Sequence, residues 1–259
     1  DITTFRTAAA WRYTPTGTAF NVAYGTGQKA PTFIERFGFS SGGQFGPSFI
    51  GNAGLKPEHS RGWEVGVTQA LWQKRLRLNA TYFNERLKDE IFGFLVDATG
   101  TTATAVNQDG ASRRDGVELS FNASLGWGFG LTGGYTYLDA SEIDRVTGLR
   151  KDEVRRPHHQ VNGTLDWKGL NDRMRASAYF THSGRQEDLG FFAPTFQQQR
   201  VRMDSFTTLG TTVSYDLSRA LQLHARVENV LDDRHEEVLG YRVPGIGVYA
   251  GLKFAFDGP

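Results

Sequence analysis

Four arginines form two adjacent pairs, and they are the side chains of this sequence best suited to holding an anion. The pairs are Arg113–Arg114 and Arg155–Arg156. A guanidinium group binds a carboxylate or a phosphate through paired, charge-assisted hydrogen bonds. Carboxylates stand close by in the sequence, at Asp115, Asp152 and Glu153. We therefore favour ordinary ion pairing inside the protein for these arginines, and keep anion binding as the alternative.

Phenylalanines gather in two stretches that are otherwise rich in glycine or polar residues. The first stretch contains Phe33, Phe37, Phe39, Phe45 and Phe49, and the second contains Phe191, Phe192 and Phe196. Such side chains either capture an apolar ligand or pack against one another at the surface, and the sequence favours neither interpretation.

Other residue types that often carry chemistry give weaker patterns. His158 and His159 suggest a metal or haem site, but neighbouring residues of a strand point to opposite faces, so the two rings cannot converge on one ion. Ser183 stands beside His182 without a nucleophile elbow around it. The segment 25–27 lacks the Lys-Ser/Thr and the helix of a phosphate-binding loop. We expect the chain not to be an enzyme and to use no metal or cofactor.

Composition excludes several classes of protein. The 259 residues carry a net charge of +1, which gives no signal for a nucleic-acid partner, and no cysteine, which excludes disulfides and thiol chemistry. Mean hydropathy is −0.43, and no stretch approaches the roughly 20 apolar residues of a membrane-spanning helix. With 31 Gly, 13% aromatic residues and only 8 Pro, the composition is typical of an all-β protein with short alternating strands.

Apolar and polar residues alternate with a period of two through much of the chain. In the segment 117–125 every odd position is apolar, whereas the even positions are Glu, Ser, Asn and Ser. The same alternation runs through 76–82, 221–227 and 248–256. Segments of about ten residues with this period, separated by turns, indicate a transmembrane β-barrel that faces lipid outside and water inside.

The connections between these segments alternate between short and long. Short turns are predicted at 15–17, 72–74, 126–128, 168–173 and 216–219, and long connections at 28–60, 93–111, 139–156, 183–202 and 232–243. Outer-membrane barrels have short periplasmic turns and longer extracellular loops. Aromatic residues near the short turns, among them Trp11, Trp72 and Trp127, fit an aromatic belt at the periplasmic interface. This asymmetry predicts the orientation of the sheet.

The pattern predicts about eleven strands, from residues 3–14 to residues 248–256. A complete single-chain barrel has an even number of strands. An open sheet would expose unpaired backbone groups to lipid, at several kcal/mol each. We therefore expect further strands to come from sequence upstream of Asp1.

Five motifs resemble the C-terminal half of TonB-dependent outer-membrane receptors. The most specific is GNAGLKPEHS at 51–60 followed by WEVG at 63–66. The others are AYGTGQKAP at 23–31, RDGVE at 114–118, RRP at 155–157 and ENVLD at 228–232. The RDGVE motif departs from the family's RGVE by one inserted Asp.

This resemblance implies a 22-stranded barrel closed by an N-terminal plug domain. Residues 1–256 would be the C-terminal part of that barrel, and 257–259 a short C-terminal extension or tag remnant. The plug and the TonB box lie outside this sequence. The implied location is the bacterial outer membrane. The implied partners are its lipid, the barrel-assembly machinery, an extracellular small-molecule ligand, and TonB acting through the plug.

Within the family, several segments are similar to the cobalamin receptor branch. They are Gly38-Phe39, the 155–156 arginine pair, Leu165-Asp166-Trp167 and Gly240-Tyr241. On this resemblance Arg155 and Tyr241 face the substrate cavity, together with Phe191 or Phe192, and we add Phe39 and Arg113 as candidate ligand contacts. Ferric siderophore and haem receptors share most of the motifs and remain alternatives. A different class of function, a plugless passive porin or a surface adhesin barrel, also remains open.

Overall fold

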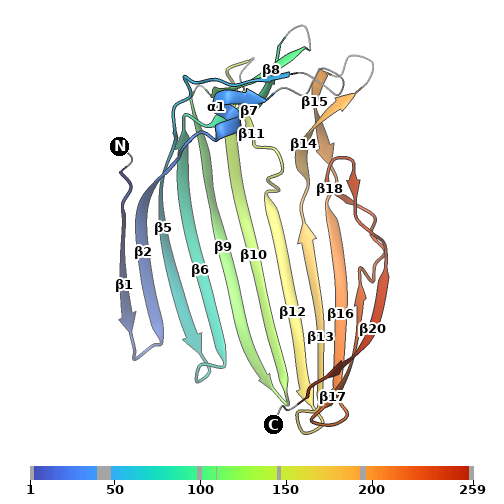
Figure 1. Ribbon diagram of the computed structural model, residues 1–259. Coiled ribbons are helices and arrows are strands. Elements are labelled where there is room, and N and C mark those ends of the chain that lie inside the picture. Colours follow the sequence, from blue (N-terminus) through green and yellow to red (C-terminus); the bar gives the residue numbers. More distant parts are fainter. Residues whose placement is uncertain are drawn as a thin grey trace.

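The computed structural model describes residues 3–39, 48–97, 101–108, 110–144, 147–192 and 197–256, except for the side chains of Phe94, Phe191, Gln197 and Gln198. Its main feature is one antiparallel sheet of 12 strands, in which eleven strands follow one another in chain order (Figure 1). The eleven are β1 (Arg6–Tyr13), β2 (Thr18–Lys29), β5 (Glu58–Leu71), β6 (Leu76–Lys88), β9 (Ala111–Gly126), β10 (Phe129–Ile143), β12 (His159–Gly169), β13 (Met174–Ser183), β16 (Phe206–Asp216), β17 (Leu221–Glu228) and β20 (Gly247–Phe254). The short β11 (Arg150–Asp152) pairs with the end of β10. The predicted all-β class and strand count are confirmed.

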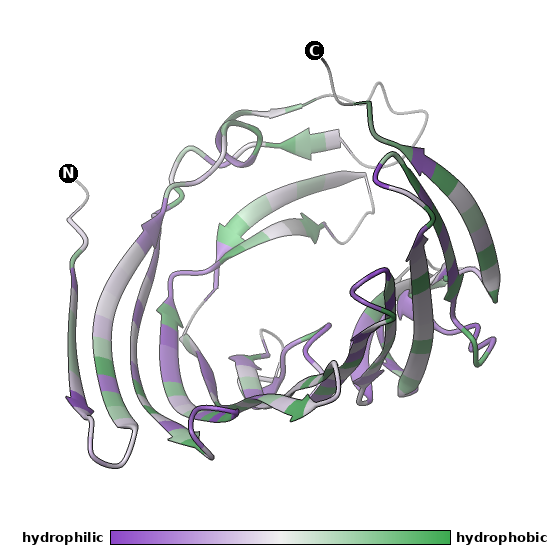
Figure 2. Cartoon of the chain, turned by 90° about the horizontal axis from the view of Figure 1, so that it is seen from below, coloured by the Kyte–Doolittle hydropathy of each residue, from purple (hydrophilic) through white to green (hydrophobic). Residues whose placement is uncertain are grey.

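The sheet curls into an incomplete ring (Figure 2), and the small loop strands lie at one end of it (Figure 1). In the described part of the chain, pairing runs from β1 to β20 without a ladder that joins these two strands. Across the described residues, no helix is long and apolar enough to cross a membrane.

The strand register extends the alternation of single strands across the whole sheet. One row of directly paired residues is Ala80, Leu119, Tyr135 and Val161. The next row, one residue further along each strand, is Thr81, Glu118, Thr136 and Gln160. Because successive side chains of a strand point to opposite faces, every strand adds apolar groups to one face and polar groups to the other.

The short turns lie together at one end of the sheet, where they were predicted (Figure 1). In the turn between β5 and β6, Trp72, Gln73 and Lys74 all have positive φ, between 51° and 70°. The N–H group of Arg75 closes this turn on the carbonyl of Trp72 at 3.0 Å. Trp72 is largely exposed, as expected for a residue of an interfacial aromatic belt.

The long connections at the other end carry secondary structure of their own, which the sequence analysis did not predict. A separate sheet joins β3 (Gly38–Phe39), β4 (Ser48–Ile50), β8 (Thr102–Asn107) and β7 (Ile91–Val96) in that order. The helix α1 (Phe33–Phe37) precedes it and begins with a capping box between Thr32 and Glu35. Two hairpins complete the set: β14 (Gln186–Phe192) with β15 (Gln197–Met203), and β18 (Glu236–Val238) with β19 (Tyr241–Arg242).

The loop sheet has a small hydrophobic core. Phe49, Leu55, Ala103 and Ala105 are buried together, with Ile91 and Val96 packed against them. Phe49 therefore matches the self-packing interpretation of the phenylalanine-rich stretch. Its partner Phe39 stacks on it at 5.7 Å between ring centroids yet remains about half exposed.

The two faces of β9 give a test of which one meets lipid. Leu119→Arg in the complete protein should cost about 2–4 kcal/mol of unfolding free energy, because it places a cation in the hydrocarbon layer. Glu118→Arg, one residue away on the polar face, should cost far less. Urea unfolding in lipid vesicles measures both. Equal losses for the two variants would contradict the assignment of the faces.

Candidate functional site

Asp188 joins three of the loops at the long-connection end. It lies in β14 and is fully buried, with no exposed surface. Its Oδ1 accepts hydrogen bonds from the Nε of Arg155 and from the N–H of Leu189, both at 2.7 Å. Its Oδ2 accepts from the N–H of Leu239 at 2.9 Å. The connection before β12, the β14–β15 hairpin and the β18–β19 hairpin therefore meet at one carboxylate, and we call this arrangement the Asp188 junction.

The electrostatics of the Asp188 junction favour the charged carboxylate. Burial by itself would raise the pKa of Asp188, but the hydrogen bonds from the Leu239 N–H, the Arg155 guanidinium and the Leu189 N–H together hold this pKa below its usual value. A second contact fixes Arg155, whose N–H donates to the carbonyl of Glu187 at 2.7 Å. This bond holds Arg155 in the left-handed backbone region, at φ 58°, which costs roughly 1–2 kcal/mol for a residue with a Cβ.

A second charged cluster surrounds Arg114 on the polar face of β9. Its guanidinium contacts Glu153 at 3.0 Å, Glu90 at 3.6 Å and Glu85 at 3.7 Å. Glu153 is only 7% exposed and also lies 3.7 Å from Arg156. Burial raises the pKa of Glu90, and the nearby charge of Glu153 raises it further, whereas Ser112 and Arg114 oppose the shift.

Arg200 contacts residues that adjoin both clusters. It donates to the carboxylate of Glu142 at 3.1 Å and to the carbonyl of Asp152 at 2.6 Å, and it also pairs with Glu187 beside Asp188. Strands β10, β11, β14 and β15 are thus connected through one guanidinium group. These contacts hold the loops of the long-connection end in a defined arrangement.

The predicted site residues fall into three places. Arg155 belongs to the Asp188 junction, and the hairpins that carry Phe192 and Tyr241 meet there. Phe192 is 42% exposed and Tyr241 is 76% exposed, whereas the side chain of Phe191 lies outside the described residues. Phe39 belongs to the loop sheet, which is a different group of loops. Arg113 occupies an odd position of β9, as the apolar residues 117–125 do, so its side chain lies on the outer, apolar face of the sheet.

The ion-pairing interpretation holds for Arg114, Arg155 and Arg156, although with partners that differ in part from those expected. Glu153 was an expected partner and pairs with two of them. Asp188 was missed, because nothing in its local sequence relates it to Arg155. The histidine pair separates as predicted: His158 contacts Asp152 at 3.2 Å, and His159 contacts the hydroxyl of Tyr135 at 2.9 Å.

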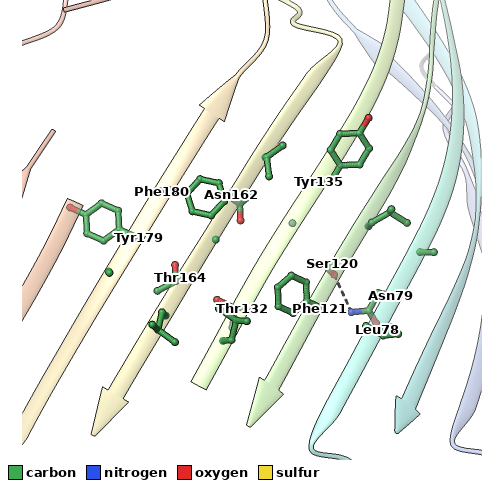
Figure 3. A pocket seen from close by; sticks show the side chains of 18 of the residues that line it. Leu78, Asn79, Ser120, Phe121, Thr132, Tyr135, Asn162, Thr164, Tyr179 and Phe180 are labelled. Atoms are coloured by element: carbon green, nitrogen blue, oxygen red, sulfur yellow. Dashed lines mark hydrogen bonds between the residues drawn. The ribbon is translucent and has the colours of Figure 1, made fainter. Parts of the chain in front are cut away.

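A hollow of about 920 Å³ lies further down the sheet, across β6, β9, β10, β12 and β13 (Figure 3). The rings of Phe121 and Phe180 stand beside Gly133 and Gly163, where a Cβ atom would come within 2.5 Å of a ring carbon. Most lining side chains belong to the apolar face, including Leu131 and Leu165. At mid-strand on this face the hollow meets acyl chains, so it is not the site of a water-borne ligand.

The family model for the TonB dependent receptor-like β-barrel matches residues 1–230. The chain belongs to the TonB-dependent receptor family. Members of this family are barrels of the bacterial outer membrane, and that is where this protein resides. They act as receptors and transporters. The end with the long loops is therefore the extracellular end.

Solved structures of several TonB-dependent receptors share this fold. The siderophore receptor PirA from Acinetobacter baumannii has a TM-score of 0.68 and 22% identity, covering 92% of this chain and 39% of PirA. A mutant of the ferric enterobactin receptor PfeA from Pseudomonas aeruginosa has a TM-score of 0.70 and 22% identity, covering 96% and 40%. The FrpB iron transporter from Neisseria meningitidis has a TM-score of 0.73 and 15% identity, covering 97% and 39%. The chain thus spans about two fifths of the length of these receptors.

Replacing the central carboxylate tests the Asp188 junction. Asp188→Asn in the complete receptor should lower the free energy of local opening of residues 186–192 and 236–242 by about 2–3 kcal/mol. The reason is that a buried, charge-assisted set of hydrogen bonds is weakened. Hydrogen exchange measures this opening. Asp172→Asn is the matched control, because Asp172 pairs with Lys168 in an exposed turn at the opposite end.

The pH dependence of the junction has a defined sign. A carboxyl group whose pKa is lowered on folding stabilises the folded state above its unfolded pKa of about 3.9, and this contribution is lost as the pH falls through the lowered value. In the wild-type receptor, the protection of the two hairpins against hydrogen exchange should therefore be constant near neutral pH and decline in acid. Identical profiles for the wild type and Asp188→Asn would contradict the role of Asp188.

Proposed function

We propose that this chain is the C-terminal part of the barrel of a receptor that imports a scarce extracellular ligand with energy delivered by TonB. Residues 1–256 would form this part, with the remaining strands and the plug supplied by other sequence. The open sheet supports the proposal, because unpaired backbone groups at the edges of β1 and β20 would cost several kcal/mol each in lipid. Residues 257–259 lie outside the described residues, and their interpretation as a short C-terminal extension or a tag remnant stays a prediction.

The observation that carries the ligand proposal is the group of side chains around the Asp188 junction. Tyr241 and Phe192 are exposed on the two hairpins that meet at this junction, and the Arg155 side chain in it is half exposed. Aromatic rings stack on the rings of a ligand, and guanidinium groups pair with its oxygen anions. A ferric siderophore, which combines aromatic or apolar groups with negative oxygens, fits this chemistry. The structural relatives named siderophore or iron receptors support the same class.

Cobalamin is the second candidate, and it rests on the sequence. The motifs around Arg155-Arg156 and Gly240-Tyr241 are similar to the cobalamin receptor branch, and both lie in loops that meet at or beside the junction. A plugless porin or adhesin remains the alternative of a different class. It predicts ion conductance of the reconstituted complete protein, whereas a plugged receptor leaves the bilayer closed.

Ligand binding to the complete receptor separates these possibilities. The probes are ferric enterobactin, ferrichrome and cyanocobalamin, each titrated by calorimetry. We expect a ferric siderophore to bind, and Tyr241→Ala to weaken it roughly tenfold through loss of stacking, about 1 kcal/mol or more. Tyr13→Ala is the control, because Tyr13 is also exposed, although less than Tyr241, and lies at the opposite end of the sheet.

The outcomes distinguish the ligand from the receptor role. Binding of cyanocobalamin alone would replace the proposed ligand class and keep the receptor. Equal affinity of the wild type and the Tyr241→Ala variant would remove the Asp188 junction from ligand binding. Steady ion conductance together with no binding of any probe would overturn the receptor proposal.

A further inference from the structure

Three arginines stand side by side on the outer face of the barrel, at the extracellular end of the strands. Arg61 of β5 pairs in register with Arg86 of β6, which pairs in turn with Arg113 of β9. All three side chains are exposed. We call them the arginine row. They share the parity of the apolar residues Val65, Tyr82 and Val117 further down the same strands.

The arginine row is unbalanced in charge. Directly opposed like charges in neighbouring strands destabilise a sheet. Within the described part of the chain, none of the three guanidinium groups has an acidic partner within 4.0 Å, unlike Arg114 on the inner face. The next row toward the extracellular end adds Lys88 opposite His59.

Acidic residues are present nearby but do not neutralise the arginines directly. Asp115 and Asp139 face each other in β9 and β10, one row closer to the middle of the membrane. Arg150 of β11 lies close to the row, and its guanidinium donates to the Ser141 hydroxyl and to the carbonyls of Ser141 and Ala111. The cationic groups of the row itself are thus left facing outward.

The surroundings of the arginine row define its depth in the membrane. Just below it, Trp63 and Tyr82 lie 5.3 Å apart between ring centroids on the same face. Aromatic side chains of this kind mark the boundary between the hydrocarbon layer and the headgroups. The apolar face continues beneath them. The arginines therefore stand at the level of the outer-leaflet headgroups.

The cationic side chains at this level line a common hollow. It has a volume of about 790 Å³, and its lining includes Arg61, Arg86, Lys88, Arg113 and Arg150. Phe5 is among the other residues that line it. Guanidinium groups match phosphate geometry through paired hydrogen bonds.

We propose that the arginine row binds the phosphate groups of an outer-leaflet glycolipid of the lipid A type, whose acyl chains lie along the apolar face below. The lipid supplies the negative charge that the outer face lacks and the hydrocarbon that this face requires. A free anion destined for import would instead meet the inner face and the loops. Such a lipid site requires only that the barrel lies in the outer membrane, whatever ligand the receptor imports.

The test measures lipid retained by the complete, delipidated receptor in phosphatidylcholine bicelles. The probes are diphosphorylated lipid A and the same lipid without its phosphates, and the readout is lipid mass spectrometry after gel filtration. The wild type should bind the phosphorylated form at least tenfold more tightly. The triple variant Arg61→Gln, Arg86→Gln, Arg113→Gln should lose this preference.

Two controls address charge and folding. The variant Lys74→Gln, Arg75→Gln, Arg219→Gln removes the same charge from turns at the opposite end and should bind like the wild type. If the glutamine variant fails to fold, the comparison of the two lipids on the wild type still decides. Equal binding of both lipids, equal binding by wild type and triple variant, or displacement by inorganic phosphate at the same concentration as lipid A would each overturn the proposal.

Discussion

The backbone hydrogen bonds of the strands are the constraint on which the rest of this structure depends. A hydrocarbon layer offers no partner to an N–H or a carbonyl group, so every such group must be paired within the protein. An antiparallel ladder satisfies this requirement and at the same time fixes side chains in alternation between two faces. The apolar outside, the polar inside and the division between short turns and long loops all follow from it.

This constraint also explains how much of the fold could be predicted from the sequence. Where a strand crosses lipid, the alternation is nearly strict, as in residues 117–125 of β9. Beyond the membrane the requirement for an apolar face ends, although the ladder continues, and β9 in fact begins at Ala111. The loop sheet was missed for the same reason. Its strands are short, and they pack around Phe49 instead of facing lipid, so no long alternation marks them.

The site was predicted less well, because its contacts join loops that are distant in the chain. Arg155 and Asp188 are 33 residues apart, and their loops meet because β12 begins beside the end of its antiparallel partner β13. The sequence suggested neighbouring carboxylates as partners, and this was correct for Glu153 with Arg156 but not for Arg155. A buried charge is stabilised by the opposite charge or hydrogen-bonding group that lies close to it in space, however distant that group is in the sequence.

Arg113 and Arg114 lie on opposite faces of β9, and the alternation within this strand is enough to predict it. The parity rule that separates His158 from His159 also separates Arg113 from Arg114, since Val117 and Leu119 assign the odd positions of β9 to the apolar face. The two arginines are adjacent in the chain and carry the same ionisable group. The inner one is surrounded by the carboxylates of Glu85 in β6 and of Glu90 and Glu153 in two of the long connections. No loop of the described chain brings an acidic partner to the outer one, so its counter-charge must come from the solvent or from the membrane.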